Sequence, residues 1–213
     1  MVINHDKKFI FIHIPKNGGT SMYKSFGQPS KQYDWHIPAK YLRSVVSEEI
    51  WNTYYKFAFI RNPWDRLVSL YHFIGEREST GEFNEWVTTY DDSKDRGARQ
   101  ENGGYFGQTA PWDKPVSSAR KSQLYYVTDD SGELILDYIY RFEYINRGLW
   151  NLVLDHTNML PKNDIENHFP AHVRQRKDKT PYTEFYNEKG LAHVDKYFKK
   201  DVEFFNYEFG KEE

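Results

Sequence analysis

Residues 15–21 combine the features of a phosphate-binding turn. Their sequence is Pro15-Lys16-Asn17-Gly18-Gly19-Thr20-Ser21, between an apolar run and a stretch with helical spacing. The first backbone N–H groups of a helix point outward, and the helix dipole favours an anion beside them. The two glycines let the backbone approach closely, the lysine adds a positive charge, and the two hydroxyls add hydrogen-bond donors. These residue types at this spacing predict a site for a phosphate or sulfate group.

The turn is not a Walker A loop, the phosphate-binding sequence of many nucleotide-hydrolysing proteins. Walker A requires G-x-x-x-x-G-K-[ST], with the lysine after the glycines, whereas Lys16 precedes Gly18 and Gly19. A glycine turn between a strand and a helix is also an ordinary connection. Taken alone, this motif is therefore compatible with either phosphate binding or a purely structural turn.

A second candidate site begins at Arg61, directly after the apolar run 57–60. Ligands of open α/β sheets bind at the carboxyl ends of the strands, and a guanidinium group can bond two phosphate oxygens at once. Ser69 lies about 10 Å further along the following helix, so a shared phosphate would lie along the flank of that helix. The alternative is that Arg61 pairs with a carboxylate and Ser69 is an ordinary helix serine.

The elements that carry these motifs form two strand–turn–helix units. The nearly continuous apolar run 9–14 is typical of a parallel strand buried on both faces, and residues 20–26 have helical spacing. The run 57–60 predicts a second buried strand. Asn62 is suited to cap the next helix and Pro63 to occupy its first position.

The rest of the chain alternates similar segments without an internal repeat or a linker. We predict helices at 39–54, 83–90, 143–156 and over most of 182–205, and strands at 124–127 and 134–142 around the turn 129–132. Polar loops are expected at 91–114 and 168–181. The pattern predicts an α/β fold, with a central parallel sheet flanked by helices in a single domain over residues 1–213.

Composition limits the classes of function. The 213 residues carry 29 basic and 31 acidic side chains, so the net charge of −2 predicts no binding to nucleic acid or to an anionic membrane. The chain has no cysteine, which excludes disulfides, thiolate metal sites and a cysteine nucleophile. Neither a signal peptide nor an apolar run of about 18 residues is present, so we expect a cytoplasmic protein. Pro170 separates His168 from His172, and we predict no metal site.

Taken together, the two motifs resemble the sulfotransferases that use 3′-phosphoadenosine-5′-phosphosulfate (PAPS). The resemblance is closest to the carbohydrate branch, which includes uronyl 2-O-sulfotransferases and bacterial relatives. Residues 11–21 are similar to the loop that binds the 5′-phosphosulfate, and residues 57–71 to the segment that binds the 3′-phosphate. The segments 141–143 and 201–209 resemble later family motifs. Asn17 departs from the family, which more often has threonine or serine there.

This resemblance implies a P-loop-type fold, PAPS as co-substrate with PAP as product, and transfer without a metal. The acceptor would be a hydroxyl, which the family branch implies to belong to a sugar. The resemblance also implies the residues that hold the donor, and these are Pro15, Lys16, Asn17, Gly18, Gly19, Thr20, Ser21, Arg61, Ser69, Arg174 and Arg176. Lys16 would stabilise the charge that develops on the departing phosphate.

Transfer also requires a base that takes the proton of the acceptor hydroxyl. His36 has the placement of the catalytic histidine in this family branch, between the two motifs, and a carboxylate base is the alternative. We expect His13, inside the first strand, and His72 to be structural. Arg141 and Glu143 either orient the site or form a structural ion pair. A P-loop nucleotide kinase and a non-catalytic PAPS- or glycan-binding module are the alternative functions.

Overall fold

The computed structural model describes residues 1–26, 36–75, 81–89, 121–145, 147–157 and 178–211. Four strands form one sheet: β1 (Val2–Asn4), β2 (Phe9–Ile12), β3 (Tyr55–Ile60) and β4 (Tyr138–Arg141). The helices are α1 (Gly19–Phe26), α2 (Ala39–Arg43), α3 (Glu48–Thr53), α4 (Pro63–Gly75), α5 (Phe83–Thr88), α6 (Leu124–Val127), α7 (Arg147–Thr157), the 3-10 turn η2 (Tyr182–Phe185), α8 (Glu188–Tyr197) and α9 (Lys199–Phe204).

The sheet is mostly parallel and has the order β1-β2-β3-β4. β2 and β4 both lie parallel to β3, with Ile12 opposite Ala58 and Arg141 opposite Ile60. β1 is antiparallel to β2. The carboxyl ends of β2, β3 and β4 therefore lie at one edge, and both sequence motifs leave the sheet there.

Alternation along the strands gives the two faces of the sheet different side chains. One face carries aliphatic residues, including Ile10, Ile12 and Ile60, which belong to the larger core. The other face carries aromatic rings from Phe9, Phe11, Phe57, Phe59 and Tyr140. Because successive strand residues point to opposite faces, the uninterrupted apolar runs in the sequence bury both faces, as predicted.

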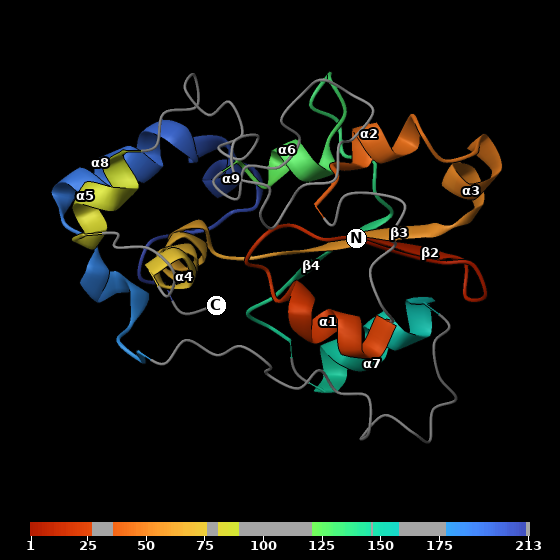
Figure 1. The fold of residues 1–213 in the computed structure, drawn as a ribbon, viewed down its shortest axis with the longest axis horizontal. Helices are drawn as coiled ribbons and strands as arrows, with labels where there is room; N and C mark the ends of the chain where they lie inside the picture. Colours follow the sequence, from red (N-terminus) through yellow and green to blue (C-terminus); the bar gives the residue numbers. More distant parts are fainter. Residues whose placement is uncertain (27–35, 76–80, 90–120, 146, 158–177, 212–213) are drawn as a thin grey trace.

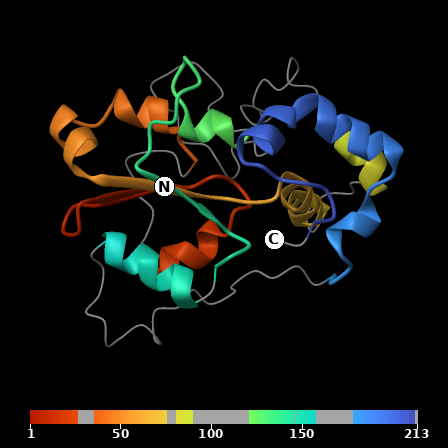
Figure 2. The same ribbon diagram turned by 180° about the vertical axis from the view of Figure 1, so that it is seen from behind.

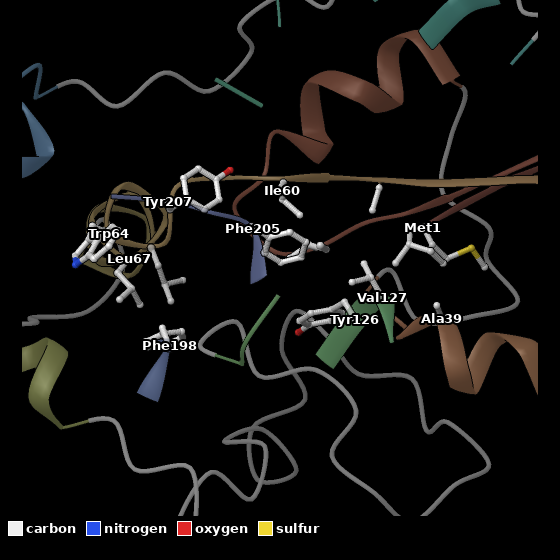
Figure 3. Packing of buried hydrophobic residues seen from close by; sticks show 14 of the residues in the cluster. Met1, Ala39, Ile60, Trp64, Leu67, Tyr126, Val127, Phe198, Phe205 and Tyr207 are labelled. Carbon is white, nitrogen blue, oxygen red and sulfur yellow. The ribbon is translucent and has the colours of Figure 1, made fainter. Parts of the chain in front are cut away.

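Helices cover both faces (Figures 1 and 2). α1 and α7 pack on the aromatic face through Met22, Trp150 and Val153. α2, α3 and α6 lie on the aliphatic face, and α4, α5, α8 and α9 extend beyond the carboxyl end of β3 (Figure 1). Trp64 and Leu67 of α4 share one core with Val127 of α6 (Figure 3).

The structure confirms the α/β class, the mostly parallel sheet and the two strand–turn–helix units. The first strand is shorter than expected and ends at Ile12. The helix expected over 39–54 is interrupted, because Ser47 caps a separate helix α3 by accepting from the N–H of Ile50 at 3.3 Å. β1 was not predicted. No helix in the described part of the chain is both long enough and apolar enough to cross a membrane.

The strand predicted at 124–127 is wrong, because these residues form the short helix α6. The reason lies far away in the sequence: the Asp201 carboxylate accepts hydrogen bonds from the N–H groups of Gln123 and Leu124, at 2.6 and 3.0 Å. Such bonds satisfy the first N–H groups of a helix. The strand predicted at 134–142 is reduced to β4, and Leu134 forms an isolated bridge with Thr128.

We predict that Asn62→Ala lowers the free energy of unfolding by about 1–2 kcal/mol, the usual cost of removing an N-cap. The Asn62 side-chain oxygen accepts from the N–H groups of Trp64 and Asp65, at 3.1 and 3.2 Å, and its side chain is buried. Urea denaturation would measure the loss. Ser47→Ala is the matched control at an exposed cap, and an equal or larger loss in that variant would contradict the prediction.

Candidate functional site

The turn between β2 and α1 holds Lys16 in an uncommon backbone conformation. Its φ is 70° and that of Gly18 is 77°, both in the left-handed region. A side-chain-bearing residue there costs on the order of 1–3 kcal/mol, and such positions cluster at functional sites. The strain at Lys16 must therefore be offset by contacts to the neighbouring backbone.

Two arginines supply those contacts. The Arg66 Nε donates to the carbonyl of Pro15 and the Arg61 Nη1 donates to the carbonyl of Lys16, each at 3.0 Å. Hydrogen bonds from charged groups contribute roughly 1.5–3 kcal/mol each, enough to offset the strain. Because the C=O and N–H of a trans peptide point in opposite directions, the Lys16 N–H points away from Arg66.

Packing inside the protein requires the two glycines of the turn. A Cβ on Gly18 would overlap the ring of Phe142, and a Cβ on Gly19 would overlap the ring of His13. The sequence argument was that glycine lets a phosphate come close to the backbone. The structure adds a different reason, because the missing side chains leave room for rings of the protein itself.

Arg61 lies where the sequence placed it, directly after β3, and it does pair with a carboxylate. Its Nε and Nη2 contact Asp65 Oδ2 at 2.8 and 2.6 Å, in addition to the bond to Lys16. The guanidinium group has five N–H donors, so two remain. Its centre also lies 5.4 Å from the ring centroid of Phe142. Arg61 can therefore hold the turn and still donate to an anion.

One face of α4 connects the two motifs. Asp65, Ser69 and Phe73 are spaced four residues apart, so they lie along the same side of the helix. At one end of this row Asp65 binds Arg61, and at the other the Lys16 Nζ lies 3.9 Å from the ring centroid of Phe73. The half-buried Ser69 lies between them on a flank that faces the turn.

His36 is buried against the strand end of the first motif. Its Nδ1 lies 2.9 Å from the carbonyl oxygen of His13, and the two imidazole centroids are 4.2 Å apart. Since a carbonyl oxygen only accepts, Nδ1 carries the proton and the lone pair is on Nε2. The His13 Nδ1 in turn lies 2.5 Å from the Tyr23 hydroxyl, as expected for a buried, hydrogen-bonded histidine.

Burial keeps both imidazoles neutral. It lowers the pKa of His36 to about 3, and positive groups nearby, including Arg66 and Lys16, act in the same direction. Burial and the neighbouring His36 also hold the pKa of His13 well below 6.5. An imidazole in water has a pKa near 6.5, so burial makes His36 a much weaker base than a histidine on the surface.

Asn17, the position that departs from the family, links the turn to β3 and to the start of α6. The buried side-chain amide donates to the carbonyl of Phe59 and to the Gln123 Oε1, both at 2.7 Å. A threonine or serine hydroxyl has only one O–H donor and could not make both of these bonds. The side-chain NH2 group of Asn17, which was predicted to bind the donor, therefore makes its hydrogen bonds inside the protein.

Arg141 and Glu143 contact different partners. Arg141 donates to the carbonyl of Phe205 and lies 4.5 Å from the ring centroid of Tyr207. Glu143 accepts from the N–H of Asn62 and from the Tyr207 hydroxyl, the latter at 3.2 Å. Burial raises the pKa of Glu143. Both residues hold the strand ends against the C-terminal segment, which favours a structural role.

The remaining residues singled out in the sequence either lie outside the described residues or, in the case of His72, lie on α4. Arg174, Arg176 and the 91–114 loop lie outside the described residues, as do His168 and His172. His72 Nε2 lies 3.7 Å from Asp178 Oδ2, beside the ring of Phe185. Among the described residues, no group of three or more His, Asp or Glu side chains could hold a metal ion.

Sequence reasoning assigned no role to Arg66, Phe73 or Gln123. The sequence did hold a signal for Arg66, which lies four residues before Leu70 and so on the buried side of the helix. A charged residue that is buried requires polar partners. No spacing marked Gln123, whose hydrogen-bond partners Arg61 and Asn17 lie 62 and 106 positions away in the sequence.

Comparison with known proteins gives one result. A protein-family sequence model described as "Sulfotransferase family" matches residues 1–208, and the match covers both motifs and the C-terminal segment. No curated protein and no solved structure matches the chain significantly.

The two buried histidines predict how stability depends on pH. Between about pH 3 and 6.5 the unfolded chain protonates His36 and the folded protein does not, so the free energy of unfolding rises with pH by up to about 1.4 kcal/mol per unit. The raised pKa values of Glu143 and Asp201 act in the opposite direction. We therefore expect the pH slope of stability to be less positive in His36→Asn than in the wild type. The free energy of unfolding would be measured by denaturant titration at several pH values from 5 to 7. The same pH slope in the wild type and in His36→Asn would contradict this prediction.

Proposed function

Because the chain belongs to the sulfotransferase family, we propose that it moves a sulfuryl group from PAPS to a hydroxyl of a carbohydrate. Family membership supports an enzyme that transfers sulfate. The donor, the acceptor and the residue roles are our proposal. Its main support is the convergence of the two motifs, in which Arg61 holds the Lys16 carbonyl at 3.0 Å and the Asp65, Ser69 and Phe73 face of α4 lies beside the turn.

The residues around the turn suit a donor with two anionic ends. Residues 15–21 would hold the 5′-phosphosulfate, with the positive charge of Lys16 and the hydroxyls of Thr20 and Ser21. The two remaining donors of Arg61, together with Ser69, would hold the 3′-phosphate along the flank of α4. Thr20 is exposed and Ser69 half-buried, so ligand atoms can reach both. Arg174 and Arg176 stay predicted contacts.

When bound, PAPS supplies the sulfuryl group on a phosphate leaving group. By analogy with phosphoryl transfer, the reaction is an in-line displacement in which negative charge grows on the departing oxygen. The Lys16 ammonium group would leave the Phe73 ring and neutralise this charge. A preorganised donor of this kind is typically worth on the order of 10²–10³ in rate.

His36 is the proposed general base. Its hydrogen bond to the His13 carbonyl fixes the tautomer, so that Nε2 is the atom that would accept the acceptor's proton. A pKa of about 3 makes it a weak base in the donor-free protein. Negative charge bound beside Lys16 would raise this pKa, because a nearby anion favours the imidazolium. The donor would thus strengthen the base that the transfer needs.

The P-loop-type fold and the sugar hydroxyl as acceptor are inferred from the family branch. We propose a single domain over residues 1–213 and a cytoplasmic location from the sequence pattern alone. No observation on the described residues favours a nucleotide kinase or a non-catalytic binding module.

The direct test incubates the protein with PAPS and a panel of sugars, lipids and small alcohols, and detects the mass of an added sulfuryl group. We expect transfer to a sugar, and PAP should raise the melting temperature by mass action. Lys16→Met is the matched control, expected to bind PAP but to turn over at least about 10²-fold more slowly. No thermal shift at millimolar PAP would exclude this donor, and turnover of ATP with Mg²⁺ instead would favour the kinase.

His36→Asn tests the base. The asparagine amide can still donate to the His13 carbonyl, but it cannot accept a proton, so turnover should fall by about 10²-fold or more. PAP affinity, measured by calorimetry, should change little. If His36→Asn keeps most of its turnover, the base lies elsewhere, and the carboxylates of residues 76–101 become the candidates.

A further inference from the structure

Gln123 lies where the two motifs meet, although it belongs to neither. It immediately precedes α6 and its side chain is fully buried. It follows residues 90–120 in the sequence, far from the turn at Lys16 and from Arg61. Its position in the fold therefore results from tertiary packing.

The side-chain amide of Gln123 pairs with the backbone of Arg61 as a neighbouring strand would. Its Oε1 accepts from the Arg61 N–H at 2.9 Å, and its Nε2 donates to the Arg61 carbonyl at 2.7 Å. β3 itself ends at Ile60, one residue earlier. Gln123 thus extends the hydrogen bonding of β3 by one residue beyond its end.

The same amide reaches the other motif. The Gln123 Oε1 also accepts from the Asn17 Nδ2 at 2.7 Å, and that nitrogen donates to the carbonyl of Phe59 as well. Since both partners of the Asn17 Nδ2 are acceptors, the orientation of its amide is fixed. The pairing with Arg61 fixes that of Gln123 in the same way. One buried side chain therefore bonds to the turn and to the strand end together.

Gln123 is itself held from the C-terminal segment. Its backbone N–H donates to the Asp201 Oδ2 at 2.6 Å, and Ser122 Oγ donates to Oδ1 of the same carboxylate at 2.5 Å. Asp201 is completely buried on α9. The Lys121 carbonyl accepts from the Arg66 Nη1 at 2.9 Å, so this segment also contacts the arginine that holds Pro15.

We propose that Gln123 is a positioning residue that sets the distance between the two anion-binding motifs. This inference rests on the proposed function, because the two motifs act as one site only for a donor that carries both a 5′-phosphosulfate and a 3′-phosphate. If Arg61 shifted relative to Lys16, each motif could still bind one anionic group. The donor could then no longer contact both motifs at the same time.

The test compares PAP affinity in the wild type, Gln123→Met and Gln123→Glu. Methionine leaves the Arg61 N–H and carbonyl without their partner, so we expect PAP to bind about tenfold more weakly or worse. In Gln123→Glu the carboxylate faces the Arg61 carbonyl at neutral pH, whereas a protonated carboxyl could donate to it. The affinity of Gln123→Glu relative to the wild type should therefore recover as the pH falls from 8 to 6, and that of Gln123→Met should not.

Thr128→Val is the matched control at the residue that ends the same short helix, because the buried Thr128 hydroxyl donates locally to the Leu124 carbonyl at 2.7 Å. It should lose stability without losing PAP affinity. Hydrogen exchange gives a readout without a ligand: the Arg61 amide should exchange faster in Gln123→Met than in Thr128→Val.

The outcomes separate the two proposals. A wild type that does not bind PAP would overturn the proposed function, and the exchange rate of Arg61 would still decide the role of Gln123. Folded Gln123→Met and Gln123→Glu variants with wild-type PAP affinity would overturn the positioning role. So would an unchanged Arg61 exchange rate.

Discussion

The rest of the site depends on two hydrogen bonds, which Arg66 and Arg61 donate to the carbonyl groups of Pro15 and Lys16. Lys16 occupies a left-handed backbone conformation that the isolated turn would not hold. Arg61 and Arg66, which flank the start of α4, satisfy these carbonyls. The position of α4 therefore determines the conformation of the turn, and α4 is positioned in turn by the cap at Asn62 and by the core around Trp64 and Leu67.

Positive side chains gather locally in a chain whose net charge is −2. Lys16, Arg61 and Arg66 lie at the carboxyl edge of the sheet, and Asp65 forms an ion pair with Arg61. Burial, together with the positive charges of the N-terminus, Arg66 and Lys16, keeps His36 neutral. An anion bound beside Lys16, as proposed, would raise the pKa of His36, so donor binding and proton acceptance would be coupled by Coulomb interactions.

The C-terminal segment contacts the residues that follow the carboxyl ends of the strands. Asp201 binds the N–H groups at the start of α6, and Tyr207 bonds to Glu143, which itself accepts from the Asn62 N–H. Through Gln123 and Glu143, these contacts connect the C-terminal segment to both motifs. The family match, which extends to residue 208, includes the residues that make them.

The sequence by itself determined the features that depend on neighbouring residues. Strand alternation, helix spacing, the cap at Asn62 and the glycine turn follow from interactions within about four residues, and the structure confirms the two strand–turn–helix units that they predict. Lys16 and Arg61 were each placed after a buried strand, and the structure brings the Arg61 Nη1 to 3.0 Å from the Lys16 carbonyl.

Only the tertiary structure decided the features that depend on burial and on distant partners. The sequence 124–127 is apolar enough for a strand, yet a carboxylate from Asp201 satisfies the first N–H groups of a helix instead. The pKa of His36 falls to about 3 because neighbouring elements exclude water from it, and no local pattern encodes that exclusion. Gln123 became part of the site for the same reason: its amide bonds to residues 62 and 106 positions away, which only the folded chain brings within reach.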